Sequence, residues 1–324
     1  MRRLVAFSAI GAGLALIVFT FASSAFLRMD EGQQLRDRFR EVTTTKGFAQ
    51  FGANVAEATK AVDELVTKTY PKFASDSGMS TKQYTAYVAS NFSDVSRGVT
   101  TVHDLPNLIT PITSGVAALP DGKFQPLYDL PVGGISLASV PWLLLGGGAA
   151  VLVLGLIALG LPGRRTTLLV LVAGIALILV PVAASLPSKT EQTGKILELC
   201  DYGLSADAAL RSEQASYYTD AMIRQLKTEL FPAVAKQRHV SVAMLQTQLK
   251  TESPALSKWV DDWTVVGPAT LGFAAAIRES VSQYAQVRDF PFEETPWLLI
   301  ALGCVVVVVA GAALVESRRS RDQK

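Results

Sequence analysis

Residues 137–186 read LASVPWLLLGGGAAVLVLGLIALGLPGRRTTLLVLVAGIALILVPVAASL, and Arg164 and Arg165 are their only charged residues. On each side of this arginine pair lies an uncharged run of about 20 residues, the length that a helix needs to cross a hydrocarbon core about 30 Å thick. Backbone polar groups in lipid must be satisfied within the segment, so each run is expected to be helical. The stretch therefore predicts a transmembrane helical hairpin.

Two further uncharged stretches lie near the ends of the chain, and they extend the prediction to four transmembrane helices. The predicted spans are residues 4–27, 137–161, 166–186 and 296–315. The chain of 324 residues is 49% hydrophobic and only 18% charged, whereas soluble proteins carry about 25% charged residues. This composition excludes an ordinary cytosolic enzyme, a nucleic-acid-binding protein and a disordered protein. We expect an all-α integral membrane protein.

Basic residues predict the orientation of the spans. The short flanks 1–3, 162–165 and 316–324 contain only Glu316 and Asp322 as acidic residues. Their basic residues are Arg2, Arg3, Arg164, Arg165, Arg318, Arg319, Arg321 and Lys324. The long segments 28–136 and 187–295 have a slight acidic excess, and basic flanks stay in the cytoplasm. We therefore expect cytoplasmic termini, including a tail at 316–324, and two outer helical domains at 28–136 and 187–295.

The first span has a second interpretation. Arg2-Arg3, an apolar run and the small residues Ala22 to Ala25 also fit a secretory signal with a cleavage site after Ala25. The apolar run is longer than a usual signal core, and the internal symmetry of the chain requires a helix there. These two observations favour a retained helix and leave cleavage open.

The two outer segments are equally long, and each lies between two predicted spans, which indicates a tandem duplication. A shift of 161 residues brings similar residues together, and near the end of the repeat the shift becomes 155. The matching positions are Tyr70-Pro71 with Phe231-Pro232, Ser80 with Ser241, and Pro141-Trp142 with Pro296-Trp297. Both copies run in the same direction, so an axis along the membrane normal would relate them.

Apolar spacing predicts helices throughout both outer segments. From Phe48 to Leu65 the apolar residues recur every three or four positions, as in a coiled-coil seam. Ser80 with Gln83 forms a capping box. In the second copy Ser205 and Ser241 are expected to open helices, Pro232 to end one, and Gly267-Pro268 to begin another.

Motifs for chemistry are absent from the sequence. The spans lack the ionisable groups that a transport pathway needs, and neither His103 nor His239 has a second metal-binding residue at helical spacing. No G-x-S-x-G occurs in the outer segments. Cys200 and Cys304 lie too far apart in the predicted topology to pair, and large outer domains without disulfides favour a bacterial envelope. We therefore expect no enzyme activity, cofactor, metal or nucleic-acid partner.

Small and aromatic residues supply the candidate binding sites. Glycines in the spans allow helices to approach closely, either within this chain or against a partner's helices. These candidate docking residues are Gly11, Gly13, Gly146, Gly147, Gly148, Gly303 and Gly311. Trp142 and Trp297 are predicted interface anchors. Trp259 and Trp263, with Phe290 and Phe292, would form a groove for lipid or a partner, unless the two tryptophans belong to the core.

Three functional hypotheses follow. The first is a non-catalytic accessory or scaffold subunit of a bacterial envelope complex, with other integral membrane proteins and lipid as partners. The second is a lipid- or small-ligand-binding module: a span, an outer helical bundle and a second span resemble the sensor half of bacterial chemoreceptors and sensor kinases, but no output domain follows. The third is a membrane enzyme, with Arg28–Glu31 and Asp289–Glu294 as its only candidate residues.

Overall fold

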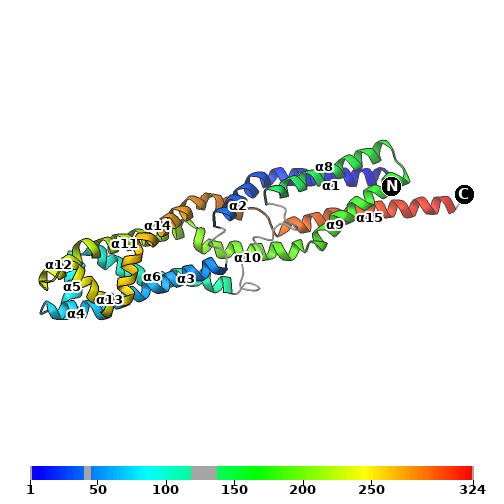
Figure 1. The fold of residues 1–324 in the computed structure, drawn as a ribbon. Coiled ribbons are helices and arrows are strands. Elements are labelled where there is room, and N and C mark those ends of the chain that lie inside the picture. The colour runs from blue at the N-terminus through cyan, green and yellow to red at the C-terminus, as the bar shows by residue number, and fades with distance from the viewer. Residues whose placement is uncertain (1, 40–44, 118–136, 323–324) are drawn as a thin grey trace. The chain divides into compact units, whose positions relative to one another are not determined.

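The computed structural model describes residues 2–39, 45–117 and 137–322, and every regular element in these ranges is a helix (Figure 1). The chain divides into two compact units, each of which is described by itself. The span unit comprises Met1–Phe39, Phe124–Glu198 and Ser282–Lys324, and the bundle unit comprises Arg40–Lys123 and Leu199–Val281. The expectation of an all-helical protein is confirmed for the described residues.

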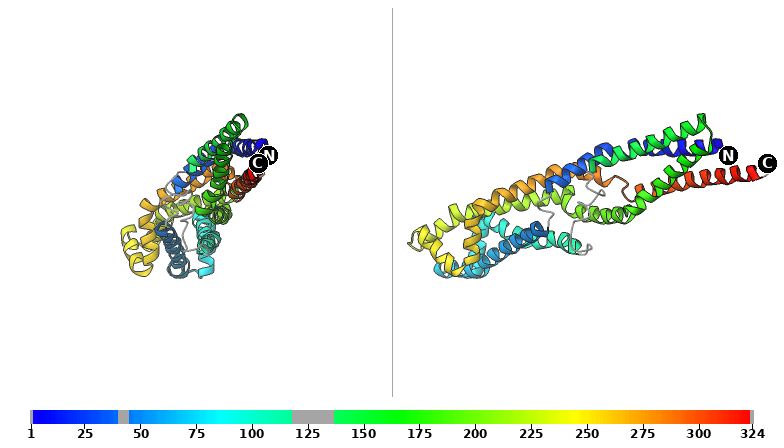
Figure 2. Two further views of the ribbon diagram at one scale, coloured as in Figure 1. Left: turned by 90° about the vertical axis from the view of Figure 1, so that its right-hand side faces the viewer. Right: turned by 45° about the vertical axis from the view of Figure 1, so that its right-hand side comes forward.

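Among the described residues, the span unit contains four helices that are long and apolar enough to cross a membrane, the same number as the predicted spans. They are α1 (Arg2–Ala22), α8 (Val140–Gly160), α9 (Arg164–Ala183) and α15 (Glu294–Asp322). Helix α1 packs along α8, and α9 packs along α15. The start of α1, the α8–α9 turn and the end of α15 lie at the same end of this unit (Figure 2).

The first and last spans differ from their predicted bounds. Helix α1 ends at Ala22, inside the predicted span 4–27, and α2 (Ala25–Phe39) begins after a break at Ser24, whose φ is +51°. A second break of this kind lies at Ser185, with a φ of +53°, between α9 and α10 (Leu186–Leu204). At the other end of the chain, α15 continues to Asp322, through most of the predicted tail.

Glycines bring the paired span helices into backbone contact. A methyl group on Gly13 of α1 would lie 2.6 Å from the carbonyl oxygen of Gly148 on α8. A methyl group on Gly303 of α15 would lie 2.7 Å from the carbonyl oxygen of Gly174 on α9. Only glycine allows so close an approach, so these residues set the distance between the helices of each pair.

The bundle unit is built from two successions of helices with the same order. The first is α3 (Thr45–Glu64), a π-helical turn η1 (Leu65–Thr69), α4 (Tyr70–Asp76), α5 (Thr81–Asn91) and α6 (Ser93–Ala117). The second is α11 (Ala206–Gln225), a π-helical turn η5 (Leu226–Leu230), α12 (Phe231–Gln237), α13 (Val242–Glu252) and α14 (Pro254–Arg288), of which the part up to Val281 belongs to the bundle unit. Every element of the first succession starts 161 positions before its counterpart in the second, beginning with Thr45 and Ala206. Helices α3 and α11 also end at positions, 64 and 225, that differ by 161.

The two successions share one hydrophobic core. Its fully buried side chains include Leu65, Phe73 and Tyr84 from the first succession and Leu226 and Leu245 from the second. The bundle unit thus takes its helices from both predicted outer domains, 28–136 and 187–295, rather than leaving each segment to form a core of its own.

Each succession caps a helix of the other. The Glu64 carboxylate, at the end of α3, accepts hydrogen bonds from the backbone N–H groups of Ala255 (2.8 Å) and Leu256 (3.2 Å) in the first turn of α14. The Gln225 side-chain oxygen, at the end of α11, accepts bonds from Asp94 (3.0 Å) and Val95 (3.1 Å) in the first turn of α6. The first N–H groups of a helix have no partner within it, so the two successions satisfy each other's helix ends.

Three of the predicted helix starts are confirmed. Ser80 forms the capping box with Gln83, and the Ser205 and Ser241 hydroxyls accept bonds from the first turns of α11 and α13. The prediction that Pro232 ends a helix is wrong, because Pro232 lies in the first turn of α12, where proline needs no N–H partner.

The predicted helix start at Gly267-Pro268 is also wrong, since α14 runs without a break through Pro268. Gly267 serves packing instead of helix termination. A methyl group on Gly267 would lie 2.6 Å from the indole nitrogen of Trp263. Gly267 is therefore explained by a tryptophan that lies against the helix backbone.

Candidate functional site

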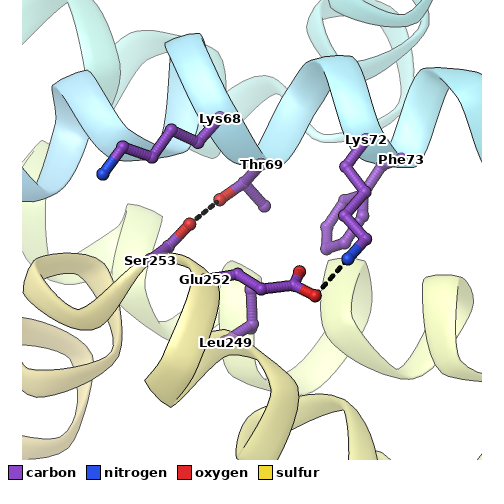
Figure 3. A pocket seen from close by; sticks show the side chains of 7 residues that line it. All are labelled: Lys68, Thr69, Lys72, Phe73, Leu249, Glu252 and Ser253. Atoms are coloured by element: carbon purple, nitrogen blue, oxygen red, sulfur yellow. Dashed lines mark hydrogen bonds and ion pairs between the residues drawn. The ribbon is translucent and has the colours of Figure 1, made fainter.

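A surface recess of about 330 Å³ lies in the bundle unit (Figure 3). Two sets of residues from distant parts of the chain line it: those of η1 and α4, and those at the junction of α13 and α14. The lining residues are Lys68, Thr69, Lys72, Phe73, Leu249, Glu252 and Ser253. The recess is thus formed where the first succession of helices meets the second.

Two buried hydroxyl groups lie side by side in the recess. The Thr69 and Ser253 side-chain oxygens are 2.9 Å apart, and the two residues are 2% and 1% exposed. Each hydroxyl has one proton to donate, and the bond between them uses only one of the two protons. The other O–H group has no acceptor among the described residues.

Two lysines one helical turn apart border the same recess. Lys72 pairs with Glu252, and Figure 3 shows this ion pair beside the two hydroxyl groups. The Lys68 ammonium donates to Glu64 at 3.0 Å. Each ammonium group has three protons to donate, so a single carboxylate partner leaves donors available on both lysines.

Glu64 links this recess to the cap of α14. Burial acts to raise the pKa of Glu64, but the hydrogen bond from Lys68 and the backbone bonds from Leu256 and Ala255 outweigh it and lower the pKa below its ordinary value. The carboxylate is therefore ionised at neutral pH. It accepts bonds from Lys68 and from the first turn of α14 at the same time.

The predicted aromatic groove is not open in this structure. Trp259 and Trp263 are 5% and 8% exposed and belong to the core of the bundle unit. Their rings meet edge to face at 5.7 Å, and the Trp263 indole N–H donates to Asp220 at 2.9 Å. The structure places the pair in the core, which is the alternative that the sequence left open.

The other predicted aromatic residues lie in the span unit. Phe290 is buried against Ala25 and Met29, and Phe292 packs on it with ring centroids 4.8 Å apart. Trp142 and Trp297 are 65% and 61% exposed. Both indoles lie near the start of a span helix, and their role as anchors at the membrane interface stays a prediction.

The structure separates the candidate docking glycines into two groups. Gly13, Gly148 and Gly303 are buried between the paired span helices of this chain. A methyl group at any residue of the second group would meet no neighbour within 4 Å. This second group consists of Gly11, Gly146, Gly147 and Gly311.

Metal-binding side chains do not gather within the described ranges. No cluster of three or more metal-binding side chains occurs there, and Cys200 and Cys304 are both free. Burial, and to a smaller extent the charge of Asp201, raises the pKa of Cys200 to about 12. Its thiol is therefore protonated at neutral pH, whereas a nucleophilic cysteine acts as the thiolate.

Sequence reasoning missed the recess, although a signal for it was present. A shift of 161 places Lys68 on Glu229 and Thr69 on Leu230. At these two positions the copies therefore differ in charge and in polarity. The recess is marked by residues that differ between the two copies, whereas the residues that indicate the duplication are similar in both.

Comparison with protein-family models, curated proteins and solved structures finds no match to this chain. The class of this protein follows from its own features. Four helices are long and apolar enough to span a membrane, and the remaining described elements are helices as well. These features are those of a multi-pass helical membrane protein.

Proposed function

We propose that this chain is a non-catalytic accessory or scaffold subunit of a larger complex in a bacterial inner membrane. One observation carries the proposal: the small residues of α8 exceed what the chain's own packing uses. Gly148 contacts α1, whereas a methyl group on Gly146 or Gly147 would meet no atom of another helix within 4 Å. Small residues on a membrane helix allow the backbone of a second helix to approach closely, so this free face suits a partner's helix.

The proposed orientation places both termini and the α8–α9 turn in the cytoplasm and the bundle unit outside. It rests on the basic residues of the short flanks. It is supported by the common position, at one end of the span unit, of the start of α1, the α8–α9 turn and the end of α15 (Figure 2). Arg3, Arg164 and Arg165 belong to these segments.

We further propose that the chain arose by tandem duplication. The matched helix bounds of the bundle unit support it, and so do single residues with a left-handed backbone. Ser24 and Ser185 have φ values of +51° and +53°, and Gly78 and His239 have values of +65° and +56°. Both pairs are 161 positions apart. Gly13 and Gly174 share this spacing, and Gly148 and Gly303 are 155 apart, which are the two shifts that the sequence predicts.

Two substitutions at neighbouring glycines test the scaffold role. The full-length protein is purified at its native level in mild detergent, and its assembly is measured by native mass spectrometry. We expect a stoichiometric larger complex for the unmodified chain. Gly147→Leu should insert normally but lose the partner, because it fills the free face of α8.

Gly148→Leu is the matched control. A side chain there meets Gly13, Leu16 and Ile17, so this variant should lower the thermal stability of the chain itself. A loss of assembly in Gly148→Leu would therefore reflect disturbed packing within the chain and not a blocked docking face. A lone unmodified chain, or a Gly147→Leu variant that keeps its partner, would contradict the proposal.

The second hypothesis, a lipid- or small-ligand-binding module, requires a different site from the one first predicted. Trp259 and Trp263 lie in the core, so they do not line a groove. The recess beside Lys68 and Lys72 is the place in the described bundle unit to which the observations point.

A further inference from the structure

We propose that the recess formed by η1, α4 and the α13–α14 junction binds the phosphate group of a small organic molecule. Lys72 and Lys68 would supply positive charge, and the Thr69–Ser253 pair would supply a hydroxyl donor. This inference is independent of the scaffold role, because it concerns the bundle unit and not the faces of the span helices.

The bundle unit contains a second region, here called the matched place, whose residues correspond to those of the recess. Its residues show which side chains the fold itself requires at these positions. At a spacing of 161, the positions that correspond to the recess carry no lysine and no hydroxyl group. The corresponding residues are Glu229, Leu230, Ala233, Val234, Val88, Asn91 and Phe92. Leu230 and Phe92, at the positions of the two hydroxyl residues, are buried in the hydrophobic core. The fold therefore accepts apolar residues where the recess has Thr69 and Ser253.

Polar residues at this place need an explanation other than folding. Burying a hydroxyl group costs free energy unless it is hydrogen-bonded, and the pair leaves one O–H group without an acceptor among the described residues. A leucine and a phenylalanine fill the matched place without this cost. An acceptor atom from a bound molecule would use the spare O–H group.

The charges favour an anion as that molecule. Lys68 and Lys72 are separated by four positions on one helical face, and each has one carboxylate partner. Glu252 is the resident partner of Lys72, in a pair whose side chains are 44% and 37% exposed. Exposed ion pairs contribute about 0–1 kcal/mol, so an anionic phosphate group, whether a monoester or the diester of a lipid headgroup, can replace Glu252 as the partner of Lys72.

The start of α14 adds to this preference. Ser253 directly precedes Pro254, the first residue of a helix that continues to Arg288. The N-terminal end of a helix carries a partial positive charge that favours anions. Glu64 offsets part of this charge by accepting from Ala255 and Leu256. The lysines and the spare hydroxyl proton remain for the ligand.

Size and lining indicate more than an inorganic ion. A volume of about 330 Å³ lies at the lower end of the range, about 300–1,000 Å³, that small-molecule sites occupy. Phe73 and Leu249 give the recess an apolar side beside the lysines. We therefore expect an organic phosphate, either free or as the headgroup of a phospholipid.

Calorimetric titration of the full-length protein in detergent tests the site, with glycerol 3-phosphate as the probe at constant ionic strength. We expect saturable binding to the unmodified chain. Lys72→Gln and the double variant Thr69→Val, Ser253→Ala should each weaken binding at least tenfold. Lys250→Gln is the matched control, because Lys250 is an exposed lysine of the same unit outside the recess. It should leave the affinity unchanged.

Two further measurements separate the source of the phosphate and guard against misfolding. Native mass spectrometry from bilayers of phosphatidylglycerol or phosphatidylcholine shows whether a lipid headgroup occupies the site, and Lys72→Gln should release such a lipid. Thr69→Leu combined with Ser253→Phe copies the matched apolar place, and it should keep the helical circular dichroism while losing the probe. The proposal is overturned if neither probe nor lipid binds the unmodified chain, or if binding is insensitive to the recess variants.

Discussion

Glu64 and Gln225 perform the same structural task with different chemistry. Each ends a helix at matched positions, and each accepts two backbone N–H groups from the first turn of a helix in the other succession. Glu64 is a carboxylate bound by Lys68, whereas Gln225 is a neutral amide that donates to Glu229. Only the Glu64 cap should therefore depend on its own protonation.

Replacement of Glu64 by glutamine should remove this dependence. The pKa of Glu64 is lowered in the folded protein, so its contribution is present above the unfolded value of about 4.3 and is lost as the pH falls through the lower, folded value. We expect the Tm of the unmodified protein to fall between about pH 5 and pH 3, and that of Glu64→Gln to fall less steeply. Thermal unfolding followed by circular dichroism measures both.

The control for this titration is Glu213→Gln. Glu213 is an exposed carboxylate that pairs with Arg278 and caps no described helix. Its replacement should leave the acid dependence of the Tm close to that of the unmodified protein. Equal slopes for Glu64→Gln and the unmodified protein would show that the α14 cap does not depend on the charge of Glu64.

Among the elements, the span helices show how glycine position decides its role. Gly11 and Gly13 are two residues apart on α1 and face different surroundings: a methyl group on Gly13 would meet the backbone of α8, and one on Gly11 would meet no atom of another helix within 4 Å. Residues two apart on a helix point in different directions. Glycine content alone therefore could not separate internal packing from an available surface.

Substitution at these two glycines should have unequal effects. Gly13→Val inserts a branched side chain against Gly148 and Leu152, and such overpacking costs about 1–3 kcal/mol. Gly11→Val meets open space and should cost much less. Thermal unfolding in detergent compares the two variants. A similar loss of Tm for both would mean that α1 and α8 do not pack through Gly13.

At the scale of the whole molecule, the proposed orientation can be tested with single cysteines in a variant without Cys200 and Cys304. Lys250→Cys lies in the bundle unit, and Arg165→Cys lies at the start of α9; both positions are exposed. A membrane-impermeant maleimide should label Lys250→Cys in intact cells. It should label Arg165→Cys only after the membrane is permeabilised. The reverse pattern would invert the proposed topology.

Much of this architecture was predictable, because it depends on local rules. Uncharged runs predict spans, and Ser80, Ser205 and Ser241 predict helix starts from the hydrogen bonds that their hydroxyls can accept. The contact between the two successions was not predictable in the same way. Apolar spacing tells which face of a helix is buried but not which helix covers it.

The candidate site was missed for the same reason. Thr69 and Ser253 are 184 positions apart, and the recess exists only because η1 meets the α13–α14 junction. The groove predicted at Trp259 and Trp263 rested on large apolar residues at helical spacing, a pattern that a buried core and an exposed groove share. The burial of both side chains in the core, the hydrogen bond from Trp263 to Asp220 and the contact with Gly267 distinguish the two.

The reciprocal caps also have a consequence for biosynthesis. The first turn of α6 needs Gln225, which lies 131 positions after Asp94. At a synthesis rate of about 5–20 residues per second, Gln225 leaves the ribosome roughly 7 to 26 s after Asp94. During that interval the first succession lacks both its cap and half of its core. The nascent chain therefore exposes apolar helix faces until the second succession has been synthesised. A chaperone or a protease would bind the chain during this interval.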